Sequence, residues 1–399
     1  MPSVNSLWWG RAVITGWYVM AIIHLWPPSS VVHGTTIIGY RLWAFQHLAY
    51  SDIFALYKNH RLYMRHLPYL RTPIEYPVLM GLTMWGVSLV TLSAKQFFVV
   101  TAVLLWIAAL TSYHYIHRLS PALAPAFALS PLLLVYGLLN WDMIGICLML
   151  MALDTFRRQC FRLSAILWAI AVFFKFFPIF FLPYLATTLW QRGQWRTLRH
   201  MLAWFTIAAA IINVPFALTN WDNWSLFFTF NASRAVSADV WNNGLVHLSS
   251  IRLIDLISLV VVLVTVAVAG RASLRSLSLE EAAAISFGVF LFVNKVFSPQ
   301  YMLWLATFGI VAEWPNWTFA TLALAGTIDY VNSVAIMYLT LVPADGGAAQ
   351  WYGATLYQIG LFARYAAIAA TTGLAPVKSW FLRSTRRISS APLSPRKYP

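Results

Sequence analysis

The chain has 399 residues, of which 60% are apolar and only 10% are charged, and its formal net charge is +15. This composition excludes an ordinary soluble domain and indicates a membrane protein. It does not indicate a nucleic-acid partner, because the basic residues gather in short gaps between apolar runs, as the positive-inside rule predicts. The two cysteines, Cys147 and Cys160, are too few for a disulfide framework.

Apolar runs follow one another through most of the chain, and about 20 apolar residues are enough for one helix to cross the hydrocarbon core. The first run, 7–26, has aromatic residues at both ends and no small-residue cleavage site, which predicts a retained helix. The runs predict an all-α, polytopic membrane protein whose bundle has about 12 transmembrane helices, between about 11 and 13, in a single domain over residues 1–374. The predicted spans are 8–26, 97–117, 121–139, 141–156, 163–177, 178–190, 201–219, 251–270, 281–297, 299–312, 317–340 and 352–374.

The longest break between apolar runs lies at residues 27–95. Its first part, 27–77, contains two of the chain's 12 acids, Asp52 and Glu75, among five basic residues. Its last part, 77–93, offers only about 17 apolar residues, which is marginal for a membrane span, and Pro77 weakens its start. We therefore expect interfacial or re-entrant helices in this segment. The five basic residues are Arg41, Lys58, Arg61, Arg65 and Arg71.

The distribution of charge predicts the orientation of the chain. If the N-terminus is cytoplasmic and 77–93 does not span, the later arginine-rich gaps all fall on the cytoplasmic side. Residues 27–95 then form the first extracytoplasmic loop, 220–250 form a second large one, and the basic tail 375–399 is cytoplasmic. If 77–93 spans, everything downstream is inverted, which the positive-inside rule disfavours. The expected location is the plasma membrane, with a site on the extracytoplasmic side.

Two acidic features fall on that outer face. Asp52 stands beside apolar residues, which would raise its pKa and suit a general base, but its spacing alone favours the cap of a short interfacial helix, 52–64. Asn140 and Asp142 interrupt a long apolar stretch, where polar groups are costly and often functional. The alternative for this pair is a tight turn that places Asp142 at a helix N-terminus, where its charge is favourable.

Two lysines occupy helix breaks that prolines mark within apolar sequence. Lys175 stands among four Phe residues just before Pro178, and it is predicted either to snorkel to the interface or to bind a phosphate. Lys295 precedes Pro299, whose break frees backbone groups that need partners. Five polar side chains at this second break exceed what a simple turn requires, so we favour a functional role. They are Asn294, Lys295, Ser298, Gln300 and Tyr301.

Two further features have structural as well as functional interpretations. The 220–250 segment mixes Trp, Asn, Asp and His residues, including Trp241 and His247. This mixture suits sugar stacking and hydroxyl recognition, but it suits an interfacial belt equally well. Asp329 and Arg364 lie inside the last two long apolar runs, and they are expected to pair with each other within the membrane.

Motifs of soluble nucleotide and hydrolase chemistry are absent from the sequence. There is no G-x-x-x-x-G-K-[ST], no G-x-G-x-x-G, no H-E-x-x-H and no G-x-S-x-G. A sugar or phosphate enzyme of this composition is therefore expected to take a lipid-linked donor from the bilayer.

Five short motifs do stand in a meaningful order. They are Tyr50-Ser51-Asp52-Ile53, Ile74-Glu75-Tyr76-Pro77-Val78-Leu79, Asn140-Trp141-Asp142, Lys175-Phe176-Phe177-Pro178 and Asn294-Lys295-Val296-Phe297-Ser298-Pro299-Gln300-Tyr301. In these motifs the chain resembles bacterial, chiefly actinobacterial, membrane glycosyltransferases of family 87. These are GT-C-type enzymes that look like polyprenyl-phosphate-mannose-dependent mannosyltransferases. The resemblance covers most of the chain, and the motifs are specific for the family as a set rather than singly.

The resemblance implies a GT-C-like bundle and an inverting transfer of a hexose, expected to be mannose, from a polyprenyl phosphate to a lipid or glycan acceptor. It implies that Asp52 is the general base. Basic side chains would hold the leaving phosphate, with Lys175 and Lys295 as candidates and Arg61, Arg65 or Arg71 as alternatives. The other expected substrate-binding residues are Glu75, Tyr76, Asn140, Asp142, Asn294, Gln300, Tyr301, Trp241 and His247.

The sequence departs from the GT-C pattern in two places. Many GT-C enzymes carry adjacent acids and use a divalent metal, but Asp52 has no acid beside it. We therefore expect no cofactor and assign no metal ligands. Phe173 and Phe174 are bulkier than the small residues expected before Lys175, which would alter the groove for the lipid.

Two other classes of function are compatible with the composition. A transporter or flippase of envelope lipids would be expected to show matching broken helices in two halves of the chain, and no copy of the Pro178 or Pro299 break stands at an equivalent offset. A non-catalytic membrane subunit of an envelope complex would not need an acid at Asp52. Loss of sugar transfer on the substitution Asp52→Asn would distinguish the enzyme from both alternatives.

Overall fold

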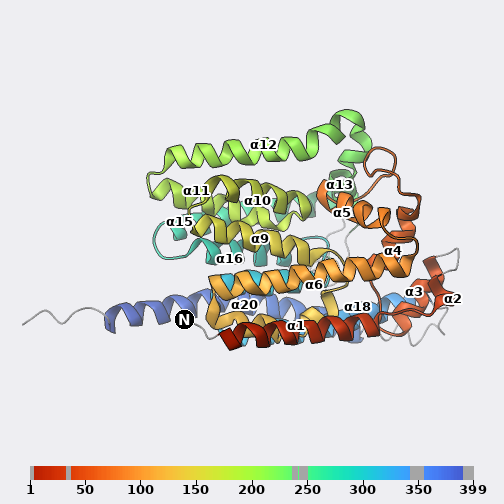
Figure 1. Ribbon diagram of the computed structural model, residues 1–399. Helices are drawn as coiled ribbons and strands as arrows, with labels where there is room; N and C mark the ends of the chain where they lie inside the picture. The colour runs from red at the N-terminus through yellow and green to blue at the C-terminus, as the bar shows by residue number, and fades with distance from the viewer. Residues whose placement is uncertain (1–3, 33–36, 236–240, 242–249, 342–354, 390–399) are drawn as a thin grey trace, which may run out of the picture.

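In the part of the chain that the structure describes, every regular element is a helix. The computed structural model describes residues 4–32, 37–235, 241, 250–341 and 355–389. Long helices lie side by side, and the short helices of the first loop gather with α13 at one end of the bundle (Figure 1). The elements are α1 (Val4–His24), α2 (Ser29–Val32), α3 (Ile37–Gln46), α4 (Asp52–Asn59), η1 (Leu62–Met64), α5 (Val78–Leu89), α6 (Ala94–Leu119), η2 (Pro121–Leu123), α7 (Ala124–Ala128), α8 (Leu132–Tyr136), α9 (Asp142–Arg157), α10 (Phe161–Phe174), η3 (Phe177–Phe181), α11 (Leu182–Gln191), α12 (Trp195–Thr219), α13 (Trp221–Ser233), α15 (Ile251–Ser273), α16 (Leu279–Val293), α17 (Tyr301–Val311), α18 (Asn316–Leu341) and α20 (Tyr357–Ser389).

Four of the described helices are long and apolar enough to cross a membrane. They are α6, α12, α15 and α18, and they have 23 to 26 residues each. At about 1.5 Å per residue, helices of this length exceed the roughly 30 Å hydrocarbon core of a bilayer. Three further apolar helices, α5, α10 and α17, are shorter. The structure thus supports the predicted all-helical membrane protein, while the predicted number of about 12 spans stays a prediction.

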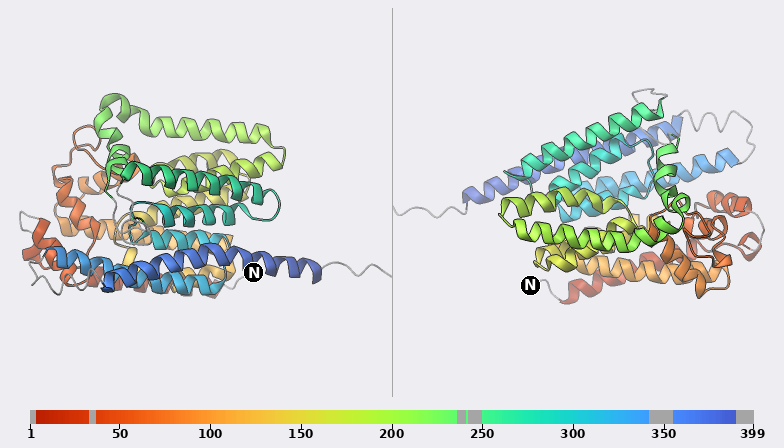
Figure 2. Two further views of the ribbon diagram at one scale, coloured as in Figure 1. Left: turned by 180° about the vertical axis from the view of Figure 1, so that it is seen from behind. Right: turned by 90° about the horizontal axis from the view of Figure 1, so that it is seen from above.

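α12 and α15 are the most exposed of the four long spans. Only 11% of the apolar window of each helix is buried, against 50% for α6. Side chains such as Ile211 on α12 and Leu263 on α15 are exposed. Such faces would be unfavourable in water, but they are the ordinary lipid-facing surface of a membrane helix. Both helices lie toward the outside of the bundle in the views of Figure 2.

The prediction of one span over 121–139 is wrong. The structure instead has the short elements η2, α7 and α8, none of which is longer than 5 residues. Pro121, Pro125 and Pro131 recur too closely for one continuous helix, because each lacks a backbone donor and its ring crowds the preceding turn. The chain then turns through Asn140 into α9.

α5 lies within the first loop and contains only 12 residues. Its rise of about 18 Å is shorter than the hydrocarbon core. The Tyr69 hydroxyl holds the start of this helix, because it lies 2.9 Å from the carbonyl oxygens of both Tyr76 and Pro77. A side chain at Gly81 would collide with the same hydroxyl. The length of α5 favours the predicted arrangement in which 77–93 does not cross the membrane.

α10 and α16 end at the two predicted breaks. Lys175 follows α10 in an extended conformation, with φ −149° and ψ 126°. Asn294 follows α16, also extended, with φ −67° and ψ 137°. Pro178 and Pro299 come shortly afterwards, so neither helix continues in register. Both breaks lie at the same end of the bundle, which brings two distant parts of the sequence together.

The predicted pairing of Asp329 with Arg364 is confirmed. Arg364 Nη1 lies 2.9 Å from Asp329 Oδ1, and both side chains are fully buried between α18 and α20. The Arg364 guanidinium also lies 4.0 Å from the ring centroid of Phe297, in the break after α16. α20 runs on to Ser389, so the predicted boundary between the domain 1–374 and the tail 375–399 falls inside this helix.

Candidate functional site

A cavity of about 420 Å³ lies at the end of the bundle where α10 and α16 end. Its wall combines both proline breaks with parts of the first loop, α13 and α15. Aromatic side chains alternate with charged ones along this wall, as they do in many sugar-binding sites. Seven of the residues predicted from the sequence line it, namely Glu75, Tyr76, Lys175, Asn294, Lys295, Gln300 and Tyr301.

Asp52 is the first residue of α4, and hydrogen bonds hold it against the turn that precedes α9. The Ser51 hydroxyl caps α4 by accepting the N–H of Ile53, and it donates to the carbonyl oxygen of Leu138 at 2.7 Å. The Asp52 N–H donates to the carbonyl oxygen of Leu139 at 2.8 Å. Because Ser51 provides the cap, the Asp52 carboxylate is left available for another role.

The Asp52 carboxylate is half-buried, and the Tyr50 hydroxyl donates a hydrogen bond of 2.9 Å to Oδ1. Burial raises the pKa of Asp52 above its ordinary value. The Tyr50 hydrogen bond and the positive charge of Lys175 oppose this increase without cancelling it, whereas the charge of Asp142 adds to it. A carboxylate with a raised pKa is a stronger proton acceptor, which is the property that a general base needs.

Asp142 and Lys175 form a buried ion pair. Lys175 Nζ lies 2.8 Å from Asp142 Oδ1, and the Asp142 side chain is fully buried. Asn140 Oδ1 accepts the N–H of Asp142 at 2.9 Å and so fixes the start of α9. The Lys175 ammonium also lies 5.5 Å from the ring centroid of Tyr76. The negative charges of Asp52 and Asp142 both act on the Tyr76 hydroxyl. Tyr76 and Lys175 therefore connect these carboxylates to the cavity wall.

Lys295 connects the second break to two other helices. Its Nζ lies 2.8 Å from Asp255 Oδ2 on α15 and 2.8 Å from the carbonyl oxygen of Ala232 on α13. Asp255 also lines the cavity, and it was missed by the prediction. The available signal was a single acid inside the apolar run 251–270, where a charge needs a partner.

Glu75 stands on the cavity wall beside two basic residues. His60 Nε2 lies 3.2 Å from Glu75 Oε2. Burial would raise the pKa of Glu75, but the hydrogen bond and charge of His60, with a contribution from Arg234, hold it below its ordinary value. Glu75 is therefore an ionised acceptor for hydrogen bonds rather than a proton acceptor. The prediction assigned no role to His60 or to Arg234, and no motif or spacing marks either residue.

The remaining candidates lie elsewhere. Trp241 Nε1 donates to the carbonyl oxygen of Val293 at 2.6 Å, so it supports the end of α16 beside Asn294. His247 lies outside the described residues. The alternative phosphate ligands in the first loop are exposed, and the structure does not place them on the cavity wall. They are Arg61, Arg65 and Arg71.

The residues around Asp52 do not form a typical metal site. Within the described ranges, no three His, Cys, Asp or Glu side chains gather in a way that could hold a metal ion. The carboxylate close to Asp52 is that of Asp142, and it is already engaged by the Lys175 ammonium. We assign no metal ligands here and derive no step through a metal ion.

The lipid-facing helices and the charged cavity at one end of the bundle define a polytopic membrane protein with a polar site. The family model described as glycosyltransferase family 87 matches residues 75–299, which is more than half of the chain, and the chain belongs to this family. The match confirms the resemblance seen in the sequence and makes the protein a membrane glycosyltransferase. It includes both proline breaks and Glu75, whereas Asp52 precedes it. A search of curated proteins finds no match to this chain.

Proposed function

We propose that this glycosyltransferase moves a hexose, with mannose as the first choice, from a polyprenyl phosphate to a lipid or glycan acceptor. The reaction takes place on the extracytoplasmic side of the plasma membrane. One observation carries the proposal: the Asp52 carboxyl, whose pKa is raised, interacts through its charge with Lys175 and Tyr76, and both of these residues line a cavity that holds three cationic side chains. A proton acceptor and an anion-binding surface are the two elements that an inverting sugar transfer from a phosphate requires.

Asp52 acts as the general base in this mechanism. Its carboxylate takes the proton of the acceptor hydroxyl while that oxygen forms a bond to the anomeric carbon. The bond between the anomeric carbon and the phosphate oxygen breaks on the opposite face, so the configuration inverts. The hydrogen bond from Tyr50 fixes the orientation of the carboxylate.

The leaving phosphate binds to the cations that lie away from Asp52. Lys175 is on the side of the base, because its charge acts on Asp52 directly. Lys295 and Arg234 line other parts of the same cavity. An inverting displacement needs base and leaving group on opposite faces of the sugar. We therefore assign the phosphate to Lys295 and Arg234, and we assign to Lys175 the task of holding Asp142 and tuning Asp52.

The sugar is bound by polar side chains that lie between Asp52 and the phosphate-binding residues Lys295 and Arg234. The ionised Glu75 accepts hydrogen bonds from hydroxyl groups, and the amides of Asn294 and Gln300 both donate and accept them. Tyr76 and Tyr301 offer aromatic faces for the sugar ring. The phenylalanines of the wall, which include Phe176 and Phe290, give the first isoprene units of the donor an apolar surface.

The test uses the purified protein in lipid with polyprenyl-phospho-mannose and a lipid acceptor. Wild type should release polyprenyl phosphate, and Asp52→Asn should lose about 10²- to 10⁴-fold in rate, the usual contribution of a general base. Asp222→Asn removes an exposed carboxylate on α13 and should leave the rate unchanged. Equal rates for wild type and Asp52→Asn would contradict the base assignment. Folded protein that accepts no lipid-phosphate sugar would contradict the donor class.

A further inference from the structure

A second cavity of about 890 Å³ lies between α1 and α6, and it opens onto the outside of the bundle. On α1 its lining residues are spaced three or four apart and share one face of the helix, from Trp8 through Arg11 and Ala12 to Thr15. On α6 the lining runs from Trp106 to Tyr115. Two antiparallel helices thus enclose an elongated slot, which we call the α1–α6 groove.

A hydrogen bond joins the two helices at one end of the α1–α6 groove, and the middle of the groove is apolar. At that end Trp106 Nε1 donates to Thr15 Oγ1 at 3.0 Å. Beyond this bond the walls are formed by Ala12, Ile107 and Leu110. The exposed Ile107 side chain and its neighbours form an apolar strip between the two helices.

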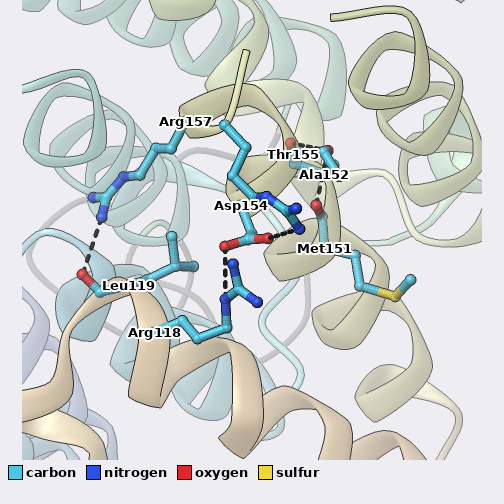
Figure 3. Close-up of polar contacts among 8 residues, drawn as sticks. Arg118, Leu119, Met151, Ala152, Asp154, Thr155 and Arg157 are labelled. Carbon is cyan, nitrogen blue, oxygen red and sulfur yellow. Dashed lines mark hydrogen bonds and ion pairs between the residues drawn. The ribbon is translucent and has the colours of Figure 1, made fainter. Parts of the chain in front are cut away.

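The other end of the α1–α6 groove is basic. The Arg11 guanidinium lies 5.6 Å from the ring centroid of Trp8, and the charges of Arg11 and Arg118 both reach His114 on the groove wall. Asp154 is the acid at this end, with Arg118 Nε 3.2 Å and Arg158 Nη1 3.8 Å from its carboxylate oxygens. Figure 3 shows Arg118 approaching Asp154 from α6. Since two arginines share this one carboxylate and Arg11 adds a third cation, the end retains a positive charge.

This basic end is far from the candidate glycosyltransferase site. α9 begins at Asp142, beside that site, and carries Asp154 near its other end. The two acids are 12 positions apart, which corresponds to about 18 Å along a helix. The basic end of the α1–α6 groove is therefore separate from the candidate glycosyltransferase site.

We propose that the α1–α6 groove binds one anionic phospholipid, with an acyl chain in the apolar slot and the phosphate at Arg11, while the charge of Arg118 acts on the same end of the groove from behind its wall. The shape accounts for the chain, because the slot is open to the surrounding bilayer along its length. The charge accounts for the headgroup, because a basic pocket between transmembrane helices attracts an anionic headgroup more strongly than a zwitterionic one. In the orientation proposed above, the bound lipid belongs to the inner leaflet.

The test is a lipid titration of the full-length protein in detergent, read by native mass spectrometry. Dioleoylphosphatidylglycerol should form a tighter first adduct than dioleoylphosphatidylcholine. Arg11→Gln should weaken the phosphatidylglycerol adduct about fivefold, the effect of one basic residue near a lipid surface, without weakening the other adduct. Ala12→Phe, which fills the slot, should weaken both.

Arg196→Gln is the matched control, since it removes one exposed arginine from α12, outside the groove. It should leave both adducts unchanged. The proposal fails if wild type binds the two lipids equally, or if Arg196→Gln weakens the phosphatidylglycerol adduct as much as Arg11→Gln does. Displacement of phosphatidylglycerol by millimolar inorganic phosphate would show a site for free anions and would also overturn it. If Arg11→Gln does not fold, Ala12→Phe alone tests the groove. Lipid adducts of Ala12→Phe that are as tight as those of wild type would then refute lipid binding in the groove.

Discussion

Lys175 Nζ lies 2.8 Å from Asp142 Oδ1, and this contact joins the end of α10 to the start of α9. The two helices form an antiparallel hairpin, so the first residue of one meets the residue that follows the other. The charges of both partners act on the carboxylate of Asp52. Single and double substitutions can measure how much the Lys175–Asp142 pair contributes to stability.

Removing only the lysine of this pair should destabilise the protein. Lys175→Met leaves the fully buried Asp142 carboxylate without its counter-charge, and breaking a buried pair in this way costs about 3–5 kcal/mol. The double substitution Asp142→Asn with Lys175→Met removes both charges and should recover most of that loss. The measurement is the free energy of unfolding in mixed detergent. Arg158→Met, which removes an arginine whose side chain is 58% exposed, should cost less than about 1 kcal/mol. A loss in the double variant as large as in Lys175→Met would show that the charge pairing is not the cause.

The acidic limb of the pH–rate profile should respond to Tyr50. The Tyr50 hydroxyl stabilises the ionised form of Asp52, so Tyr50→Phe should raise the pKa of Asp52 further. Activity requires the ionised base, and the pH at which kcat/KM falls on acidification should therefore move upward. Tyr63→Phe, which alters an exposed tyrosine of the same loop, should leave the profile in place. An unchanged profile for Tyr50→Phe would mean that a group other than Asp52 determines the acidic limb of the pH–rate profile.

Asp52→Asn should make the protein more stable at neutral pH while it slows transfer. The folded protein favours the neutral form of Asp52, because burial raises its pKa. The contribution of this residue to stability is therefore largest at low pH, and it is lost as the pH rises from the ordinary pKa of an aspartate through the raised value. An asparagine carries no charge, so its melting temperature at pH 7 should exceed that of wild type. At pH values below the ordinary pKa of an aspartate the difference should shrink. A melting temperature of Asp52→Asn below that of wild type at pH 7 would contradict a destabilising negative charge at Asp52.

Gly145 should not tolerate alanine. A Cβ at this position would lie 3.0 Å from Lys175 Cβ and 3.0 Å from the ring of Trp304. Trp304 is fully buried, so neither neighbour moves easily, and overpacking of this kind costs about 1–3 kcal/mol. The shift of Lys175 should also reduce kcat. Gly86→Ala is the control, because a Cβ there meets nothing within 4 Å on α5, and it should stabilise the protein by about 0.5–1 kcal/mol. Comparable unfolding energies for the two variants would count against the close packing at Gly145.

Much of this site could be anticipated from the sequence because prolines and isolated charges mark it. Pro178 and Pro299 located the two helix ends, and a charge within apolar sequence needs a partner, which identified Lys175 and Lys295. The acids that pair with these two lysines are harder to predict. Asp142 follows from the hairpin of α9 and α10 once their lengths are known, whereas Asp255 depends on how α15 packs against the second break.

Other parts could not be predicted because they depend on three-dimensional packing. His60 contacts Glu75 through the fold of the first loop, and no periodicity relates the two positions. The composition of 121–139 predicts a span, but the closely spaced prolines of this segment prevent one continuous helix. Ser51 rather than Asp52 caps α4, and only the geometry of the capping hydroxyl shows which of the two neighbours does so.

The docking of Ser51 and Asp52 on Leu138 and Leu139 has a consequence for divergence within the family. Main-chain groups make up much of this contact, so it constrains the path of the backbone more than the identity of the side chains. Asp52 and the turn that leads to Asp142 are therefore held together by main-chain contacts, which substitutions of side chains alter little. Changes of sugar or acceptor are expected to accumulate instead in α13 and the 294–300 turn, where a substitution reshapes the cavity without displacing Asp52.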